Sequence, residues 1–208
     1  MTCSKLRWLT TALYLAHLNP VTNAHVEIVR ELKETADAVK VMPVVFRSGQ
    51  DEINSRSFPF SFEARKRMLE SVFADTIEIT DDYTFFAPFK KYMPPLLAPK
   101  SWELRRRVLR GVDGDFFSYT GDRTEGYMLK IYRLRPRVGQ RKSLSAASVK
   151  DKLYDEVLGM ESDWKSDVPK AVAGVIEEEW DAVNKFAGLE DRTTRVAGMK
   201  FPKEGWSK

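Results

Sequence analysis

Both histidines of the 208-residue chain, His17 and His25, fall in one short segment, Ala16-His17-Leu18-Asn19-Pro20-Val21-Thr22-Asn23-Ala24-His25. Imidazole N–H groups and the hydroxyl of Thr22 are donors that can bind phosphate oxygens. Phosphoryl transfer needs such donors, because its catalysis consists mostly of positioning and charge stabilisation. The segment therefore predicts a phosphate-binding turn. The alternative is an ordinary strand-to-helix turn in which Thr22 or Asn23 caps the helix.

The elements on either side of this turn predict where it lies in the fold. Residues 11–18 form an apolar run typical of a buried strand, and Val26, Val29 and Leu32 recur with a helical period. Residues 38–46 form a second apolar run. Strand, helix and strand in this order predict a parallel sheet with a right-handed crossover. Such sheets bind ligands beyond the carboxyl ends of their strands, where a helix N-terminus offers free backbone N–H groups to an anion.

The rest of the chain continues the alternation of strands and helices. Strands are expected at 76–80 and 116–119, and helices at 62–73 (with Ser61 as N-cap), 102–109, 148–158 and 169–186. The fold class predicted is α/β, a Rossmann-like doubly wound parallel sheet with a C-terminal helical appendage. We expect a nucleotide-binding domain over residues 1–158 and a helical extension, residues 159–208, that packs on it. The last twenty residues show no clear period.

Composition restricts the class of protein. Hydrophobic residues make up 43% and charged residues 31%, which is ordinary for a globular protein, and the single Cys3 excludes an intramolecular disulfide. No apolar run is long enough to cross a membrane, so a cytoplasmic protein is expected. The net charge is +4, and much of the positive charge gathers in two basic stretches, 105–110 and 133–142. These stretches suit nucleotide phosphates or a nucleic acid, or they are solvated surface.

At the histidine turn a family resemblance appears. Asn19-Pro20-Val21-Thr22-Asn23-Ala24-His25 resembles the Asp-Pro-x-Thr-x-Gly-His signature of the nucleotidyltransferases of the HIGH superfamily, and is locally most similar to the phosphopantetheine adenylyltransferases. The resemblance implies that His25 contacts the α-phosphate region and stabilises the pentavalent transition state. It also implies that Thr22 orients the phosphates, and that His17 stands where family members contact the substrate phosphate.

Two further segments resemble the same superfamily and occur in the expected order. Residues 55–65 resemble Lys-x-x-x-Phe-Ser-x-Glu-x-Arg, which implies that Arg56 reaches the phosphates. Residues 144–150 resemble Ile-Ser-Ser-Thr-x-Ile-Arg, which implies a helix start that cradles the β- and γ-phosphates, with Lys150 adding charge. The catalytic residues predicted are His25, Thr22, His17, Arg56 and Lys150. The nucleotide-binding residues predicted are Leu15, Ala16, Asn19, Ala24, Asp122, Ser145, Ala146, Ala147 and Ser148.

Three of these positions leave alternatives open. Ala16 and Ala24 replace the two glycines of the signature. If either position requires a positive φ, alanine costs about 1 kcal/mol, and if the nucleotide approaches the backbone closely, the methyl group obstructs it. Asp122 binds ribose or a metal-bound water, or it caps a helix.

The predicted function is transfer of AMP from ATP to a phosphorylated acceptor with release of pyrophosphate. The acceptors considered are nicotinamide or nicotinate mononucleotide and phosphopantetheine. Mg²⁺ is expected to bind with the triphosphate, without a metal site of the protein's own. The alternatives are a CTP-dependent cytidylyltransferase and a catalytically impaired protein of the same fold that binds nucleotide or RNA. Two roles for the C-terminal segment are also open. It could form a homo-oligomer surface, or residues 199–203 could close over the active site.

Overall fold

The computed structural model describes residues 9–140, 142–196 and 198–206, so the predicted absence of a disulfide at Cys3 concerns a residue outside the described part. Five parallel strands form the central sheet in the order β5-β2-β1-β7-β8. Their bounds are β1 Thr10–Ala16, β2 Ala38–Pro43, β5 Glu78–Ile79, β7 Asp115–Thr120 and β8 Pro136–Val138. The parallel order with helical crossovers confirms the predicted α/β, Rossmann-like fold class.

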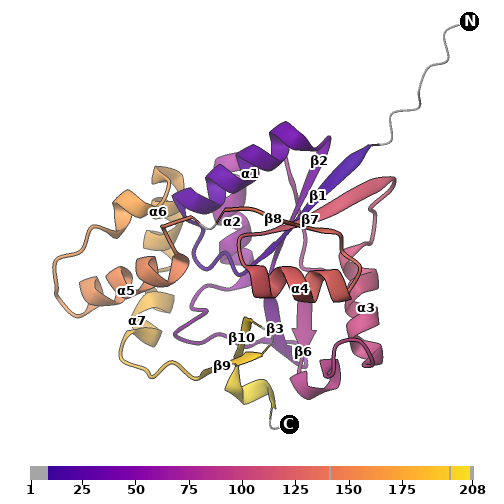
Figure 1. Cartoon of the computed structure of the whole chain (residues 1–208). Helices are drawn as coiled ribbons and strands as arrows, with labels where there is room; N and C mark the ends of the chain where they lie inside the picture. Colours follow the sequence, from indigo (N-terminus) through magenta and orange to yellow (C-terminus); the bar gives the residue numbers. More distant parts are fainter. Residues whose placement is uncertain (1–8, 141, 197, 207–208) are drawn as a thin grey trace, which may run out of the picture.

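Seven α-helices connect and cover these strands in the described part of the chain (Figure 1). They are α1 Asn23–Thr35, α2 Phe62–Phe73, α3 Pro99–Val108, α4 Arg123–Ile131, α5 Ala146–Val157, α6 Lys170–Glu178 and α7 Trp180–Ala187. Three short 3-10 helices are η1 Phe89–Tyr92, η2 Trp164–Asp167 and η3 Lys203–Trp206. Helices α5, α6 and α7 gather together at one side of the sheet, on the left of Figure 1.

Strand β1 lies at the centre of the sheet and is buried on both faces. Ala12 and Tyr14 pack into one hydrophobic cluster, whereas Leu13 and Leu15 pack into the other. Because successive side chains of a strand point to opposite faces, a strand covered on both sides must be apolar at every position. The unbroken apolar run at the start of the chain is explained by this double burial.

The second predicted strand, residues 38–46, is two strands in the structure. Strand β2 ends at Pro43, and β3 Val45–Ser48 joins a separate sheet with β4 Asp51–Glu52 and β6 Thr84–Phe86. At the junction the Val44 amide donates to Ala16 O, at 2.9 Å, which keeps the chain beside β1 before it leaves the central sheet. The prediction of one strand was therefore wrong, because an unbroken apolar run does not reveal where a chain passes from one sheet to another.

The C-terminal region also differs from its prediction. The expected helix 169–186 is broken at Glu179 into α6, which packs on α2, and α7, which packs on α5. The last residues form an antiparallel pair, β9 Thr193–Val196 and β10 Met199–Pro202, hereafter the C-terminal hairpin. Phe201 is 2% exposed and packs against Phe46 and Phe89, so the hairpin belongs to the core.

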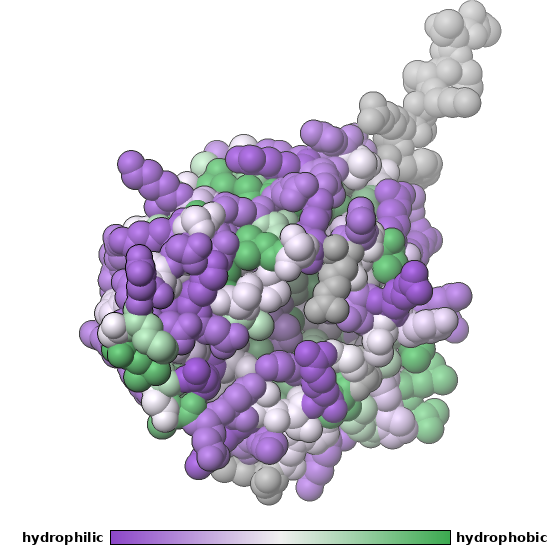
Figure 2. Space-filling model, turned by 60° about the vertical axis from the view of Figure 1, so that its left-hand side comes forward, coloured by the Kyte–Doolittle hydropathy of each residue, from purple (hydrophilic) through white to green (hydrophobic). Residues whose placement is uncertain are grey.

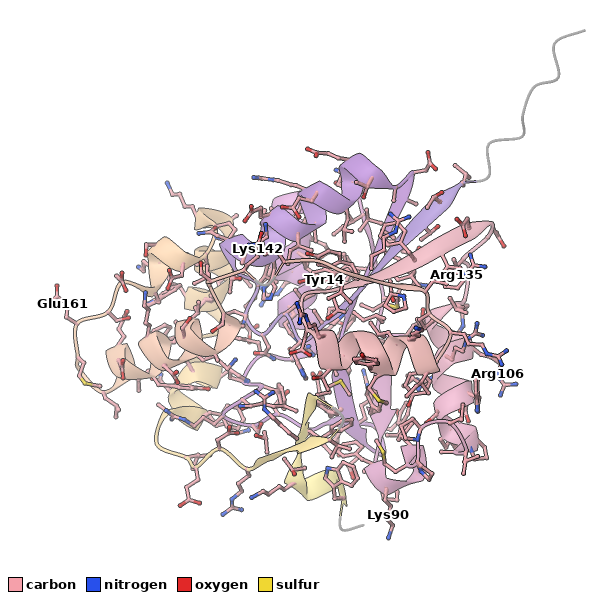
Figure 3. The ribbon with its side chains drawn as sticks, in the orientation of Figure 1. Tyr14, Lys90, Arg106, Arg135, Lys142 and Glu161 are labelled. Atoms are coloured by element: carbon pink, nitrogen blue, oxygen red, sulfur yellow. The ribbon has the colours of Figure 1, made fainter. Side chains whose placement is uncertain are left out.

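Hydrophilic side chains dominate the face drawn in Figure 2. No helix in the described ranges is both long and apolar enough to span a bilayer. The two basic stretches meet at one point: Arg105 of the first and Arg133 and Arg135 of the second line one cavity of about 430 Å³. Lys142, at the end of the second stretch, lies instead beside α1 and pairs with Glu27 and Glu31 (Figure 3). Binding of a nucleic acid to these residues stays a prediction.

Candidate active site

The histidine turn leads from β1 into α1 through a capping box. Thr22 is the N-cap residue, and its hydroxyl accepts a hydrogen bond from the His25 backbone N–H at 3.4 Å. In the opposite direction, the Thr22 backbone N–H donates a hydrogen bond to Nδ1 of the His25 ring at 3.0 Å. In a capping box this accepting group is usually a glutamate or glutamine side chain. The structure thus shows the capping alternative, in which Thr22 caps the helix and the cap orients a histidine; phosphate binding by the turn stays a prediction.

The cap also determines the protonation of His25. Burial first, and the nearby Lys150 second, lower the pKa of His25 to about 4. The ring is therefore neutral at neutral pH, and because Nδ1 is an acceptor its single proton lies on Nε2. Among the described residues Nε2 has no hydrogen-bond partner. His25 consequently presents a neutral N–H donor at the N-terminus of α1.

The turn itself is held by Asn19. Its side-chain amide donates to Phe60 O at 2.8 Å, and its Oδ1 accepts the Phe60 N–H at 3.2 Å. Asn19 is 1% exposed, so both bonds are buried. The side chain predicted to bind nucleotide is therefore occupied in tying β1–α1 to the segment before α2.

Removing these two bonds should destabilise the protein. Asn19→Ala leaves the N–H and carbonyl of Phe60 without partners in the core, and we expect a loss of about 2–3 kcal/mol in the free energy of unfolding. Urea denaturation measures it. Asn23→Ala is the matched control, since exposed Asn23 makes one hydrogen bond, to Ser166 O. Equal losses in the two variants would contradict a structural role specific to Asn19.

Helix α5 begins opposite this turn, and its N-terminus carries the third predicted motif. Ser145 is the N-cap and accepts the Ser148 backbone N–H at 3.1 Å, as expected for small residues that open a helix. One turn later, Lys150 Nζ donates to Asn19 O at 2.8 Å and to Ala146 O at 3.0 Å. Burial first, and then the charge of Lys200, lower the pKa of Lys150 to about 8.

A cavity of about 230 Å³ lies between these elements and the C-terminal hairpin, and we call it the His17 cavity. It contains five predicted site residues, which come from three places in the chain. They are His17, Asp122, Ala146, Ala147 and Lys150. Ser57, Phe58, Glu125 and four hairpin residues complete the lining. The cavity lies just past the ends of β1 and β7, which is where a doubly wound sheet binds ligands.

His17 is the first residue after β1. Its ring stacks on Phe58 with centroids 4.8 Å apart, and its Nδ1 is buried without a hydrogen-bond partner in the described residues. Burial, followed by the charges of Lys150, Arg65, Lys200 and Arg195, lowers the pKa of His17 to about 3. His17 is therefore neutral and surrounded by positive charge, an environment that favours an anion.

Asp122 and Glu125 are the acidic residues of the cavity. Asp122 is the N-cap of α4, and its Oδ1 accepts the N–H groups of Thr124 and Glu125 at 2.7 and 3.0 Å, which is the capping alternative left open from the sequence. Burial raises the pKa of Glu125 to about 7, against the opposing effect of its hydrogen bond from Thr120. Near neutral pH much of the Glu125 population is uncharged, so the cavity stays positive.

Arg56 does not join this group. Its guanidinium lies 4.2 Å from the Tyr154 ring centroid, and Nη1 donates to Phe186 O and to Ala187 O. It lines a different cavity, of about 710 Å³, between the segment 53–56 and the end of α7. The structure thus holds Arg56 away from the histidine turn, and its contact with phosphate stays a prediction.

The backbone conformation at the positions of the two replaced glycines does not require glycine, whereas obstruction of a closely approaching nucleotide by the two methyl groups stays a prediction. Non-glycine residues with positive φ in the described chain are Leu18, Ala74, Arg133 and Arg135, so neither Ala16 nor Ala24 carries backbone strain. Ala24 is buried in the first turn of α1, and the Leu15 side chain is buried in the sheet. Leu15 could contact a nucleotide only through its backbone.

Arg195 and Lys200 are lining residues that the sequence reasoning did not assign to the site. The sequence pattern that could have revealed Lys200 is the alternation of apolar and basic residues in Met199-Lys200-Phe201, which is typical of a strand with one buried face. Only three residues carry the pattern, and the cross-strand partner of Lys200 could not be read from it. The suggestion that residues 199–203 close over the site agrees with the placement of Met199 and Lys200.

The parallel central sheet and its flanking helices share their fold with solved adenylyltransferase structures. A bifunctional NMN adenylyltransferase/ADP ribose pyrophosphatase from Francisella tularensis superposes with a TM-score of 0.62 at 15% identity, over 85% of this chain and 53% of that one. NadR protein in complex with NAD and AMP-PNP gives 0.56 at 16% identity, over 82% and 46%.

A smaller neighbour extends the comparison. A proposed nicotinate-nucleotide adenylyltransferase from Vibrio parahaemolyticus gives a TM-score of 0.52 at 10% identity, over 81% of this chain and 99% of that one. The chain spans about half the length of the first two proteins. The sequence matches no protein-family model and no curated protein. These comparisons show that the chain shares the Rossmann-like fold of solved adenylyltransferase structures.

Proposed function

We propose that the protein is a nucleotidyltransferase that transfers AMP from ATP to a phosphorylated acceptor. The observation that carries the proposal is the pairing of two helix N-termini, those of α1 and α5, with neutral His25 and His17 and with Lys150 at one edge of the sheet. Helix N-termini and preorganised donors stabilise charge that develops on phosphate oxygens. The adenylyltransferase fold supports the same class of reaction.

In the proposed step an acceptor phosphate oxygen attacks the α-phosphorus of ATP. The new P–O bond forms as the bond from the α-phosphorus to the β-phosphate oxygen breaks, and pyrophosphate leaves with that electron pair. The neutral His25 donates its Nε2 proton in a hydrogen bond to an α-phosphate oxygen, while Lys150 neutralises charge on the leaving group. No residue forms a covalent intermediate, and positioning by Thr22 and Asn19 supplies the alignment.

A divalent cation fits this site only together with the substrate. Within the described ranges no three His, Cys, Asp or Glu side chains converge as a metal site. The triphosphate would supply oxygen ligands, Asp122 and Glu125 are the acidic side chains that line the cavity, and the ion would neutralise charge on the phosphates. A neighbour structure that contains AMP and a manganese ion supports a divalent ion, and we propose Mg²⁺.

Nicotinamide or nicotinate mononucleotide is the acceptor we favour, because the fold neighbours act on such mononucleotides. Phosphopantetheine is the second acceptor, supported by the local motif Pro20-Val21-Thr22-Asn23. CTP as donor and a cytoplasmic location remain proposals of lower rank. Homo-oligomers and nucleic-acid binding stay predictions.

The test is release of pyrophosphate from ATP or CTP with each phosphorylated acceptor and Mg²⁺. Turnover with ATP and one acceptor is expected. The competing function is nucleotide binding without turnover, which the replacement of both signature glycines by Ala16 and Ala24 favours. ATP binding by calorimetry with no pyrophosphate from any pair would establish that competitor and overturn the enzyme.

The pKa of Lys150 predicts how phosphate binding depends on pH. A polyanion stabilises the ammonium form, so binding raises this pKa from about 8 and takes up a proton when the pH is near or above 8. Affinity for ATP should therefore be highest below pH 8 and fall several-fold by about pH 9.5, where ATP itself no longer titrates. Calorimetry in buffers of different ionisation enthalpy measures the proton uptake. Lys150→Arg stays charged and should remove the decline; an unchanged decline would exclude Lys150 as its source.

A further inference from the structure

The C-terminal hairpin reaches the His17 cavity from outside the central sheet. Its Arg195, Gly198, Met199 and Lys200 line the cavity together with His17 and Lys150. In Figure 1 the hairpin lies below α4, and it is far in sequence from His17, which lines the same cavity. Phe201 anchors it by packing against Phe46, Phe85 and Trp206. The hairpin is therefore a fixed part of the fold.

Arg195 and Lys200 are directly opposite each other in the hairpin register. Side chains at such a cross-strand position stand on the same face of the ribbon, and two like charges there repel each other. The neighbouring pair, Thr194 and Phe201, points to the other face, where Phe201 is buried. The hairpin thus places both of its cations on the side of the cavity, at a cost in stability.

Neighbouring groups compensate only one of the two charges. Lys200 Nζ donates to Ser57 Oγ at 3.1 Å and to Asp191 Oδ2 at 3.1 Å, so it is paired with a carboxylate. Arg195 makes one long contact, from Nη1 to Gly198 O at 3.5 Å, and is exposed. In the described part of the chain Arg195 has no acidic partner. Its guanidinium is a free two-pronged donor at the mouth of a cavity that already contains Lys150.

The turn of the hairpin fits closely against the start of α4. Gly198 has φ +86, and a Cβ atom there would lie 2.9 Å from Thr124 Cγ2 and 3.1 Å from Thr124 Cβ. Both the backbone conformation and the space therefore require glycine. This contact sets the hairpin beside Asp122 and Glu125, so that its cations face the phosphate-binding turn.

We propose that Arg195 and Lys200 form a phosphate-binding pair, through which the C-terminal hairpin completes the site for a polyphosphate chain or an acceptor phosphate. The assignment rests on the proposed adenylyl transfer and names two residues that none of the three sequence motifs contains. A cavity of about 230 Å³ is smaller than the roughly 300–1,000 Å³ of whole-ligand pockets, so it suits a phosphate chain whose nucleoside lies outside it. The guanidinium of Arg195 can donate two parallel hydrogen bonds to the oxygens of one phosphate, and Lys200 adds a point charge.

Binding of inorganic tripolyphosphate and of ATP to the full chain, measured by calorimetry, tests the pair. Arg195→Gln and Lys200→Gln should each weaken tripolyphosphate binding by about tenfold, which corresponds to about 1.4 kcal/mol. Arg192→Gln is the matched control: it removes the same charge from an exposed residue that precedes the hairpin and lies outside the His17 cavity. The control should bind within about twofold of the unchanged protein. Thermal unfolding of each variant checks that the hairpin stays folded.

The outcomes separate this pair from the proposed reaction. If all three substitutions weaken tripolyphosphate binding equally, the loss reflects net charge alone and the proposed pair is overturned. Unchanged binding in Arg195→Gln, or no tripolyphosphate binding by the wild type, would also overturn it. Tripolyphosphate binding that depends on Arg195, without pyrophosphate release from any substrate pair, would leave the pair standing and remove the transferase. With turnover, a raised KM for ATP in Arg195→Gln assigns the pair to the donor, and a raised KM for the acceptor assigns it to the acceptor phosphate.

Discussion

Replacing His25 with alanine is expected to lower kcat for pyrophosphate release by about 10²–10³-fold, the usual loss when one preorganised donor to a reacting oxygen is removed. The expectation follows from the ring's geometry: Nδ1 accepts from the Thr22 N–H, so the only proton lies on Nε2. Because its pKa is about 4, the donor is neutral at every pH above about 5 and its contribution should not titrate at neutral pH. Steady-state kinetics between about pH 6 and 8 measures both effects.

A structural explanation of the same loss must be separated from a catalytic one. His25→Ala also removes half of a capping box, which costs about 1 kcal/mol. His25→Gln is the discriminating variant, because glutamine at this position preserves the box. If His25 only caps the helix, the glutamine variant recovers full turnover. If Nε2 stabilises the transition state, stability recovers while kcat remains at least tenfold low.

Local sequence patterns predicted the part of the site that is built from consecutive residues. The apolar run before Ala16, the cap at Thr22 and the cap at Ser61 each depend on neighbours within a few positions, and all three occur as expected. Their chemistry is decided by backbone donors and side chains that belong to the same turn. The orientation of His25 follows from the same local rule.

The parts that were missed depend on contacts between distant residues. Arg56 resembles a phosphate-binding position, yet Tyr154 and the end of α7 hold it elsewhere, and no local pattern encodes that competition. Arg195 faces the site only because Lys200 pairs with it across the hairpin and Phe201 is buried. The break at Glu179 lacks the usual proline or glycine, so a continuous helix was the natural expectation.

Replacing Arg65 with methionine is expected to cost about 3–5 kcal/mol of unfolding free energy, the largest stability loss we predict. The guanidinium is 2% exposed and donates to His17 O at 2.9 Å, Val44 O at 2.7 Å and Ser61 O at 3.2 Å, while Nη2 pairs with Glu52 at 2.9 Å. Methionine fills the volume of the arginine side chain but leaves the three carbonyl groups and the Glu52 carboxylate without their partner. Removing one member of a buried ion pair typically costs about 3–5 kcal/mol.

Helix α2 contains its own control for this experiment. Arg67 lies on the exposed side and pairs with Glu178 and Glu179, so Arg67→Met should cost less than about 1 kcal/mol. Adding Glu52→Gln to Arg65→Met removes the unpaired buried charge and should restore part of the lost free energy of unfolding. The rest of the loss should remain, because the carbonyl groups of His17 and Val44 still lack a donor. Since His17 is held through its carbonyl, the double variant should still bind ATP more weakly. A single variant as stable as Arg67→Met would show that Arg65 does not support the phosphate-binding turn.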